Sequence, residues 1–321
     1  MNILVTGGAG FIGSAFVRLL LSGIPGYEAL KNITVLDSLT YSGNLENLAE
    51  VRADSRLRIL TQSINDIDGV KNAVEGQDFI FNFAAESHVD RSIANASKFM
   101  QTNILGSYNI FNEALRANVG RVVHISTDEV YGSLVKGSAS ENSNLEPNSP
   151  YAASKASSDL IARSFFQTHK LPIIVTRCSN NYGPFQNPEK LVPLAITNLI
   201  MGKNVPIYGS GKNIREWIHV DDHCRAIAFL AISGTPGEIY NIGGLNAIEN
   251  LNLIELLLGF MELDTSRIEH VEDRKGHDFR YALDDSKLLK LGFRETIDFH
   301  SGILQTIKWY ETNQEWWRGL K

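Results

Sequence analysis

The amino-acid sequence predicts an α/β protein with a doubly wound parallel sheet, followed by a smaller α/β domain. Short apolar runs recur along the first half of the chain and alternate with longer stretches of helical spacing. This alternation is typical of βαβ units, whose successive strands lie parallel in one sheet. After about residue 180 the rhythm changes to loops punctuated by proline and glycine, which indicates a second domain.

The elements of the first domain follow one another in a regular order. Residues 2–6 form an apolar run, and a glycine-rich turn leads from it into a helical pattern with Phe16, Leu19 and Leu20 on one side. Later apolar runs predict further strands at residues 33–36, 57–60, 79–83, 122–125 and 173–175. The longer stretches between these runs predict the crossover helices.

The domain boundary is expected near residue 180. Residues 1–180 should form the first domain and residues 181–321 the second, with a segment of about 216–240 returning to the first. Within the later part, residues 238–242 have a strand pattern, and residues 250–262 and 301–316 have helical spacing. A chain of 321 residues exceeds the usual size of a single domain, which agrees with this division.

Composition and charge exclude several kinds of protein. With 43% hydrophobic and 21% charged residues the chain has a globular composition, and its net charge of -6 provides no basic field for nucleic acid. Cys178 and Cys224 lack the spacing of a disulfide framework or a thiolate zinc site, so a reducing, cytoplasmic location is expected. We recognise no export signal, and no segment offers the roughly 20 apolar residues of a membrane span.

A glycine-rich turn follows the first predicted strand. Its backbone can approach a pyrophosphate at a helix N-terminus through Gly7, Gly10, Phe11, Ile12 and Gly13. A plain strand-to-helix turn is the alternative, because such turns are common. Asp37 ends the second apolar run, where a carboxylate would accept bonds from ribose hydroxyls and repel a 2'-phosphate. The sequence therefore predicts a Rossmann-type domain that prefers NAD to NADP, with a capping role as the alternative for Asp37.

Tyr151 and Lys155 form an i, i+4 pair, which lies on one face if residues 151–169 are helical. A nearby ammonium favours the phenolate, so we expect the pKa of Tyr151 to be lowered toward working pH. Such a phenolate can take the proton of an alcohol. The alternative is a solvated helix pair, but this pair follows both the glycine turn and a strand that ends in Ser-Thr.

Two adjacent carboxylates, Asp128 and Glu129, follow that strand in the stretch Ser-Thr-Asp-Glu-Val-Tyr-Gly. Neighbouring strand residues point to opposite faces, so both can reach one ligand only if the backbone leaves the strand at this point. Open α/β sheets bind ligands at the carboxyl ends of their strands. Two close carboxylates also push their pKa values apart, which suits an acid and a base. A helix N-cap is the alternative for Thr127 and Asp128.

These motifs together resemble the extended short-chain dehydrogenase/reductases, and within them the dTDP-glucose 4,6-dehydratases. The resemblance runs nearly end to end and is carried by residues 6–13, 37–44, 83–90, 126–132, 151–155, 177–186, 188–191, 215–223 and 273–281. The early segments are shared by many nucleotide-sugar enzymes, whereas the Thr-Asp-Glu triplet and the Gly-His-Asp segment are more selective. The resemblance implies an NAD-binding first domain and a nucleotide-sugar-binding second domain.

The resemblance also implies a reaction. Tyr151, helped by Thr127, removes the 4-hydroxyl proton of dTDP-glucose while C4 passes its hydride to NAD. Glu129 then takes the C5 proton as general base, and Asp128 protonates the C6 hydroxyl so that it leaves as water. The hydride returns to C6, which gives dTDP-4-keto-6-deoxyglucose without net oxidation. This is the chemistry of a hydro-lyase.

Further site residues are implied by the matched positions. For the cofactor these are Ser38, Thr40, Asp66, Ile67, Phe83, Ala84, Ala85, Ser87, Thr102 and Asn181, with Asp66 and Ile67 flanking the adenine. For the substrate they are Ser87, Thr127, Asn180, Lys190, Leu191, Pro206, Ile207, Tyr208, Arg215, Asn250, Asp273, Arg274 and His277. Arg215 and Lys190 suit a diphosphate. His223 and His277 lack metal-ligand spacing, so no metal is expected.

Some positions depart from the family pattern and leave alternatives open. Lys275 stands where proline is usual, Ala247 stands where glutamate is usual, and the loop between residues 132 and 151 is short. These differences lie in the part of the site that is expected to bind the nucleotide of the substrate. A UDP-glucose 4,6-dehydratase is therefore one alternative. A UDP-sugar 4-epimerase would not need the acid/base pair, and a non-catalytic NAD-binding regulator would be expected to have lost it. The family also implies a homodimer built on helices near residues 92–116 and 149–169, with no nucleic-acid or membrane partner.

Overall fold

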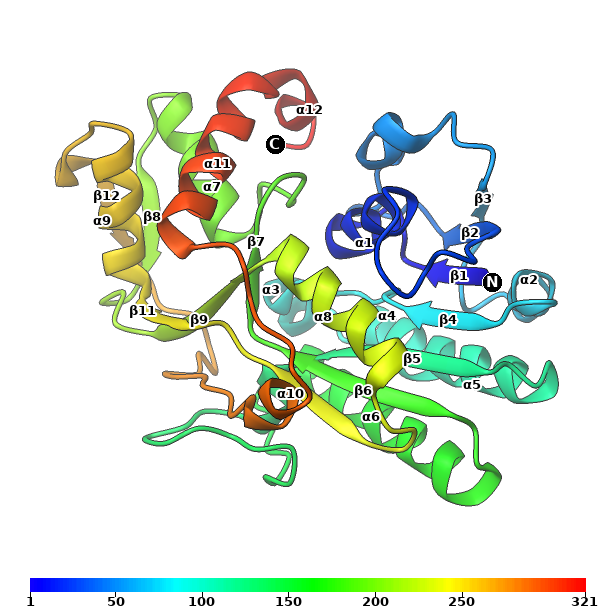
Figure 1. The fold of residues 1–321 in the computed structure, drawn as a ribbon. Helices are drawn as coiled ribbons and strands as arrows, with labels where there is room; N and C mark the ends of the chain where they lie inside the picture. Colours follow the sequence, from blue (N-terminus) through cyan, green and yellow to red (C-terminus); the bar gives the residue numbers. More distant parts are fainter.

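The computed structural model describes residues 1–321 and shows a seven-stranded parallel sheet beside a smaller α/β region (Figure 1). The strand order is β10-β6-β5-β4-β1-β2-β3. The bounds are β1 Asn2–Thr6, β2 Asn32–Asp37, β3 Leu57–Thr61, β4 Phe79–Asn82, β5 Arg121–Thr127, β6 Ile173–Cys178 and β10 Ile239–Ile242. Every neighbouring pair in this sheet is parallel. The predicted doubly wound Rossmann-type sheet is confirmed.

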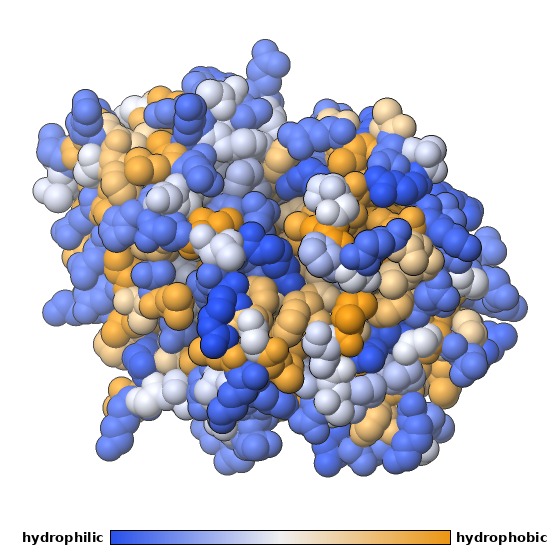
Figure 2. All heavy atoms as spheres, in the orientation of Figure 1, coloured by the Kyte–Doolittle hydropathy of each residue, from blue (hydrophilic) through white to orange (hydrophobic).

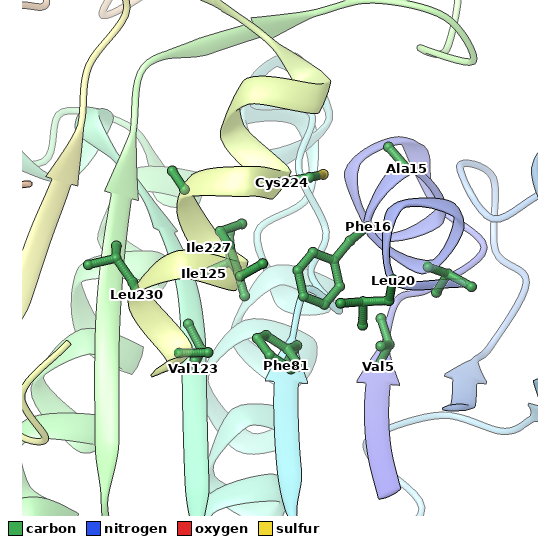
Figure 3. Close-up of a cluster of buried hydrophobic side chains, with 14 of the residues drawn as sticks. Val5, Ala15, Phe16, Leu20, Phe81, Val123, Ile125, Cys224, Ile227 and Leu230 are labelled. Carbon is green, nitrogen blue, oxygen red and sulfur yellow. The ribbon is translucent and has the colours of Figure 1, made fainter. Parts of the chain in front are cut away.

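Helices cover both faces of this sheet. One face carries α1 (Phe11–Leu21) and α8 (Val220–Ser233), which contact each other. Their apolar sides enclose a core with the strands: Phe16 and Leu20 from α1 and Ile227 and Leu230 from α8 meet side chains such as Phe81 (Figure 3). The predicted apolar side of the first helix is therefore confirmed, since Phe16 and Leu20 are buried in this core and the partly buried Leu19 packs against it.

The opposite face is covered by α2 (Ile67–Val74), α5 (Ser107–Arg116) and α6 (Pro150–His169). Their buried side chains, including Phe111 and Phe165, form a second core with strand residues such as Ile80 and Val122. Apart from the edge strand β3, the strands are largely buried on both faces because helices cover both sides of the sheet, which explains their near-continuous apolar sequences.

The segment before α5 does not form one long helix. It contains α3 (Val89–Ala94), the short α4 (Ser97–Phe99) and a π-helical stretch, Met100–Gly106, that runs into α5. Asn95 has an extended backbone, with φ -153° and ψ 99°, and separates α3 from α4. The expected helix near residues 92–116 is thus interrupted close to its start.

The smaller region has its own core. Its strands are β7 Asn180–Tyr182, β8 Val205–Tyr208, β9 Ile214–His219, β11 Asn246–Glu249 and β12 Ile268–Val271, paired in the order β11-β9-β7 and β12-β8. Its helices are α7 Leu191–Ile200, α9 Asn250–Phe260, α11 Phe299–Thr312 and α12 Gln314–Arg318. They enclose a cluster that includes Trp217, Tyr310 and Trp317. The short α10 (Ser286–Lys290) instead contacts β10.

The chain passes between the two regions more than once. After β7 to β9 in the smaller region, α8 packs on the large sheet and β10 extends its edge beside β6. On the face shown in Figure 2, hydrophobic side chains form separate patches among hydrophilic ones. No helix is both long enough and apolar enough to cross a membrane.

Candidate active site

A cavity of about 880 Å3 lies at the carboxyl ends of the parallel strands. Residues that follow β1, β2, β4, β5 and β6 line it, and residues such as Lys190 and Trp217 from the smaller region line it as well. This is the edge at which open α/β sheets bind ligands. The cavity is large enough for a sizeable small molecule.

The glycine turn forms one end of this cavity. Gly7 has φ +67°, and a Cβ there would lie 2.7 Å from the backbone nitrogen of Ala84. A Cβ on Gly13 would lie 2.2 Å from the carbonyl oxygen of Gly7. Only glycine fits either position, so the turn brings bare backbone and the start of α1 to the cavity, as a pyrophosphate site requires.

Asp37 lies at the end of β2 and lines the same cavity. Its carboxylate accepts hydrogen bonds from the backbone N-H groups of Ala9 (2.9 Å) and Leu39 (2.8 Å). Burial raises its pKa, and these two bonds oppose that shift. The capping role considered as an alternative is therefore real, but it also fixes the carboxylate beside the glycine turn.

Tyr151 and Lys155 project from the first turns of α6, which begins at a Ser149 cap followed by Pro150. The hydroxyl of Ser92 accepts a hydrogen bond from the Tyr151 backbone N-H at 3.2 Å. Lys155 is buried and its Nζ donates to the carbonyl oxygen of Ile125 at 2.7 Å. Burial lowers the pKa of Lys155 to about 8, while the carboxylate of Asp159 opposes that shift.

The predicted lowering of the Tyr151 pKa is wrong for the side chains of this structure. Burial and the nearby Glu129 raise it well above the usual phenol value, and the nearby Thr127 side chain opposes that shift. Lys155 does not offset the burial, because its ammonium is directed to a backbone carbonyl. A positive charge from a bound ligand would have to favour the phenolate.

The two carboxylates leave the strand as predicted. Thr127 is the last residue of β5, and Asp128–Tyr131 form a short 3-10 helix that ends at Gly132 with φ +74°. Thr127 caps this helix by accepting from the N-H of Glu129 at 3.3 Å. Both carboxylates line the cavity together with Tyr151. Thr127 therefore both caps the 3-10 helix and belongs to the candidate site.

Burial raises the pKa of both carboxyl groups, but not equally. The pKa of Asp128 is raised well above its usual value by burial and by repulsion from Glu129. The pKa of Glu129 is raised by burial, but nearby Arg215, Lys190 and Arg274 oppose the rise. Asp128 therefore holds its proton more strongly than Glu129, which is the order expected of an acid beside a base.

Most predicted site residues line this one cavity. They are Gly7, Gly10, Phe11, Ile12, Gly13, Asp37, Ser38, Thr40, Phe83, Ala84, Ala85, Ser87, Thr102, Thr127, Asp128, Glu129, Tyr151, Lys155, Asn180, Asn181, Lys190 and Leu191. Those outside its lining are Asp66, Ile67, Pro206, Ile207, Tyr208, Arg215, Asn250, Asp273, Arg274 and His277. Asp66 caps α2 through the N-H of Gly69, and the Ile67 side chain is exposed.

The predicted cations approach the carboxylates from the smaller region. Lys190 Nζ donates to the carbonyl oxygen of Ser87 at 2.9 Å. The Arg215 guanidinium lies over the Tyr281 ring and donates to the Asp278 carbonyl oxygen at 2.8 Å. Arg274 pairs with Asp90 on α3. All three lower the pKa of Glu129, so they lie close enough to favour its ionised form.

The histidines have structural partners. His277 Nδ1 lies 2.7 Å from Asp273 Oδ1, and His223 Nδ1 lies 2.8 Å from the Asn181 side-chain oxygen. Asn181 lines the cavity, so His223 helps to fix its amide. No group of three or more His, Cys, Asp or Glu side chains is arranged to hold a metal ion.

Sequence reasoning missed several residues that shape the site. Asn103, in the π-helical stretch, accepts from the Glu86 N-H at 2.8 Å and donates to the Ser154 hydroxyl at 2.8 Å, which fastens the loop after β4 to α6. Trp316 lines the cavity and donates to the Asn47 side chain at 3.0 Å. Neither residue belongs to a recognisable local motif, because the contacts join distant parts of the chain.

The fold and the site define a dinucleotide-binding short-chain dehydrogenase/reductase that carries an added acid/base pair. A family model described as GDP-mannose 4,6 dehydratase matches residues 4–306. A dTDP-glucose 4,6-dehydratase of Streptomyces niveus is 50% identical over 323 residues, covering 100% of this chain and 96% of the relative. The chain belongs to the family of dTDP-glucose 4,6-dehydratases.

Solved structures agree with this family. The crystal structure of DesIV, a dTDP-glucose 4,6-dehydratase from Streptomyces venezuelae with NAD and TYD bound, has a TM-score of 0.99 and 53% identity, with 100% of both chains covered. A UDP-glucose 4-epimerase from Thermotoga maritima has a TM-score of 0.89 and 30% identity, covering 98% of this chain and 100% of the epimerase. The fold is therefore shared with epimerases, whereas the higher identity lies with the dehydratase.

Proposed function

We propose that this chain converts dTDP-glucose to dTDP-4-keto-6-deoxyglucose with NAD as the cofactor. The observation that carries the proposal is the pair Asp128 and Glu129 on a 3-10 helix facing the cavity that also receives Tyr151 and Lys155. An epimerase must only remove and return a hydride, so it has no use for an acid and a base on neighbouring carbons. A dehydratase needs both.

The cavity fits NAD at its glycine-lined end. The turn has no room for a Cβ at Gly7 or Gly13, and the Asp37 carboxylate stands beside it. We assign cofactor contacts to the residues of this end, with Ser38, Thr40, the loop from Phe83 to Ser87, Thr102 and Asn181. Asp66 and Ile67 do not line the cavity, so we propose that they contact NAD only where the cofactor extends past the cavity lining. When bound, NAD supplies the hydride acceptor for C4 and returns the hydride to C6.

The protein side chains then perform four proton transfers. Tyr151 takes the 4-hydroxyl proton as the general base, and the buried ammonium of Lys155, bonded to the Ile125 carbonyl oxygen, lies one helical turn further along α6. The ketone at C4 acidifies the C5 hydrogen, and Glu129 removes it. Asp128 gives its proton to the C6 hydroxyl, which leaves as water, and Glu129 later returns its proton to C5. The larger rise in the pKa of Asp128 than in that of Glu129 supports these roles.

Positive side chains from the smaller region suit the diphosphate. Lys190 lies in the cavity wall, and Arg215 and Arg274 lie just behind it, close to Glu129. We propose that they hold the nucleotide sugar, together with Ser87, Asn180 and Leu191. Pro206 to Tyr208, Asn250, Asp273 and His277 would take part in nucleotide binding from the same side. Residues 181–321, apart from the returning segment, thus form the proposed nucleotide-sugar domain.

A homodimer is a further part of the proposal. Leu105, Tyr108 and Leu160 are exposed by 58%, 44% and 58%, and the last two lie on the neighbouring helices α5 and α6. Large exposed apolar side chains on adjacent helices favour burial against a second copy. Sedimentation showing only monomer would contradict it. We also propose a cytoplasmic location, since Cys178 and Cys224 are both free thiols.

Mass spectrometry of the product tests the function. The purified protein is incubated with dTDP-glucose and, separately, with UDP-glucose, without added reductant. We expect dTDP-glucose to lose one water. Faster dehydration of UDP-glucose would identify the UDP-sugar dehydratase, and an isomer of unchanged mass would identify an epimerase. No product from either sugar would favour a non-catalytic regulator.

A further inference from the structure

The proposed reaction requires that the cofactor stays bound between two hydride transfers. The hydride taken from C4 is returned to C6 of the same sugar, and no outside reductant takes part. Release of the reduced cofactor between the two transfers would leave the sugar without its hydride and the enzyme without an oxidant. A segment of the protein that closes the cofactor end of the cavity would therefore favour complete turnovers.

The helix α12 reaches that end of the cavity from the smaller region. Trp316 on α12 and Leu320 after it both line the cavity. Trp316 Nε1 donates to Asn47 Oδ1 at 3.0 Å, and Asn47 Nδ2 donates to the carbonyl oxygen of Ala9 at 2.8 Å. Because Ala9 belongs to the glycine turn, two hydrogen bonds join α12 to the proposed pyrophosphate site.

The amide of Asn47 is fixed by these two partners. An indole N-H can only donate and a backbone carbonyl can only accept, so the amide oxygen must face Trp316 and the amide nitrogen must face Ala9. Asn47 is 2% exposed and lies on the 3-10 helix Leu45–Val51, which follows β2. The buried amide thus gives Trp316 a defined docking point on the first domain.

Phe185 provides a second contact between α12 and the first domain. Its ring centroid lies 5.7 Å from that of Trp316, with the two rings nearly perpendicular. The guanidinium of Arg18, on α1, lies 4.3 Å from the centroid of the same Phe185 ring. Arg18 also donates to the carbonyl oxygen of Asn47. These contacts connect Trp316, Phe185, Arg18 and Asn47 in one continuous cluster.

The backbone of Phe185 indicates that this cluster has a function. Phe185 has φ +66°, in the left-handed region that a residue with a bulky side chain rarely adopts. Such strain persists only where the surroundings fix it, and it gathers at ligand sites. Phe185 also lines the cavity. An aromatic ring is therefore kept in the cavity wall, against α12, at a cost in backbone strain.

The two adjacent tryptophans of α12 have different partners. Trp317 is fully buried in the core of the smaller region, and its Nε1 donates to the Tyr310 carbonyl oxygen at 2.8 Å. Trp316 is only partly buried and points to the first domain through Asn47. Trp317 thus anchors α12, while Trp316 can separate from Asn47 without opening that core.

We propose that Trp316, Asn47 and Phe185 form a clasp that closes the glycine-turn end of the cavity and slows the release of NAD and of its reduced form. The clasp retains the cofactor and takes no part in the proton transfers. This role rests on the proposed NAD-dependent reaction and explains how one cofactor can serve both hydride transfers of a turnover.

The rate of NAD release tests the clasp. The purified holoenzyme is transferred to buffer without nucleotide, and the NAD that remains bound is measured over time after denaturation. Trp316→Phe keeps a ring beside Phe185 but lacks the N-H, so we expect release about 2- to 10-fold faster, the scale of one lost hydrogen bond. Trp316→Ala also lacks the ring and should release NAD faster still.

Turnover gives a second readout. With dTDP-glucose and no added NAD, product formation by Trp316→Ala should slow over successive turnovers, and added NAD should restore it. The wild type should not respond to added NAD. A substitution that only disturbed the catalytic groups would not be corrected by more cofactor.

Trp309→Phe is the matched control. The Trp309 ring centroid lies 4.5 Å from that of Phe185 and 5.1 Å from that of Trp316, but Trp309 does not line the cavity. Its release rate should equal that of the wild type. Equal acceleration by Trp309→Phe and Trp316→Phe, or unchanged release from Trp316→Ala, would overturn the clasp. A wild type that binds NAD but forms no dehydrated product would refute the proposed function, and the release rates would still decide on the clasp.

Discussion

At the scale of single residues, the proposed function depends on a difference in pKa between two similar buried carboxyl groups. Asp128 and Glu129 are neighbours in sequence, yet three cations lie close enough to Glu129 to oppose the rise in its pKa, against one for Asp128. Arg215 affects both groups, whereas Lys190 and Arg274 act on Glu129. The difference between acid and base therefore comes from the smaller region, not from the Thr-Asp-Glu motif itself.

Two substitutions should separate oxidation from dehydration. Glu129→Gln removes the base for C5 but keeps Tyr151, so hydride exchange with NAD, followed by absorbance at 340 nm, should continue while water loss falls by about 10²-fold or more. Tyr151→Phe should stop both, since no group then takes the 4-hydroxyl proton. Full dehydration by Glu129→Gln would refute the assignment of the base.

At the scale of elements, a buried ion pair ties α6 to β6 beneath the site. Arg177 Nε donates to Asp159 Oδ2 at 2.9 Å, and Arg177 also donates to the Tyr131 hydroxyl at 2.9 Å. Tyr131 ends the 3-10 helix that carries both carboxylates. The helix that presents Lys155 and the turn that presents Glu129 are thus held by one guanidinium.

Arg177→Met should therefore be strongly destabilising. It leaves the buried Asp159 without its partner, which costs about 3–5 kcal/mol of unfolding free energy, measurable by urea denaturation. Arg56→Met breaks the partly exposed pair with Asp54 and should lower the free energy of unfolding far less. Adding Asp159→Leu to Arg177→Met should recover part of the loss. Equal effects of the two single substitutions would contradict this account.

The glycine turn offers a second test at this scale. Gly13→Ala would place a Cβ 2.2 Å from the Gly7 carbonyl oxygen, which is backbone and cannot move aside cheaply. We expect the purified variant to carry little or no NAD, as measured by nucleotide released on denaturation. Gly259→Ala in α9 meets open space and should keep the wild-type NAD content. An unchanged NAD content in Gly13→Ala would show that the turn does not hold the cofactor.

The sequence predicts elements better than it predicts contacts between them. Each strand of the large sheet matches an apolar run, because strands buried on both faces must be apolar along their length. The break at Asn95 and the π-helical stretch carry no such periodic signal. The pKa of Tyr151 was predicted in the wrong direction, because the i, i+4 spacing shows where Lys155 lies but not that its ammonium is directed to the Ile125 carbonyl. The Trp316 to Asn47 bond spans most of the chain and has no local signature.

At the scale of the whole molecule, buried carboxyl groups make stability depend on pH. Burial raises the pKa of Glu216 and of Glu295 to about 7; the charge of Asp285 raises both further, and the charge of Glu216 also raises the pKa of Glu295. Glu216 lies on β9 in the smaller region, while Asp285 precedes α10 beside the large sheet. The charges thus gather where the two regions meet.

The thermal midpoint should fall as pH rises from about 5 to 8. A raised carboxyl pKa means that the folded protein binds more protons than the unfolded chain between their two pKa values, near 4.5 and 7. The stabilisation is complete below the lower value and is lost as pH rises through the upper one. The double substitution Glu216→Gln and Glu295→Gln should flatten this fall, whereas Glu255→Gln, at an exposed helix position, should not. A midpoint that rises over this range would contradict the assignment.

The late position of β10 in the chain has a consequence for biosynthesis. A nascent chain on the ribosome exposes the open edge of β6 until residues 239–242 emerge, and it lacks α8 over one face of the sheet until residue 233 has emerged. An unpaired strand edge and an uncovered apolar face are both templates for aggregation. The sheet of the first domain therefore cannot be completed before much of the second has been translated, and the growing polypeptide carries these aggregation-prone surfaces during that interval.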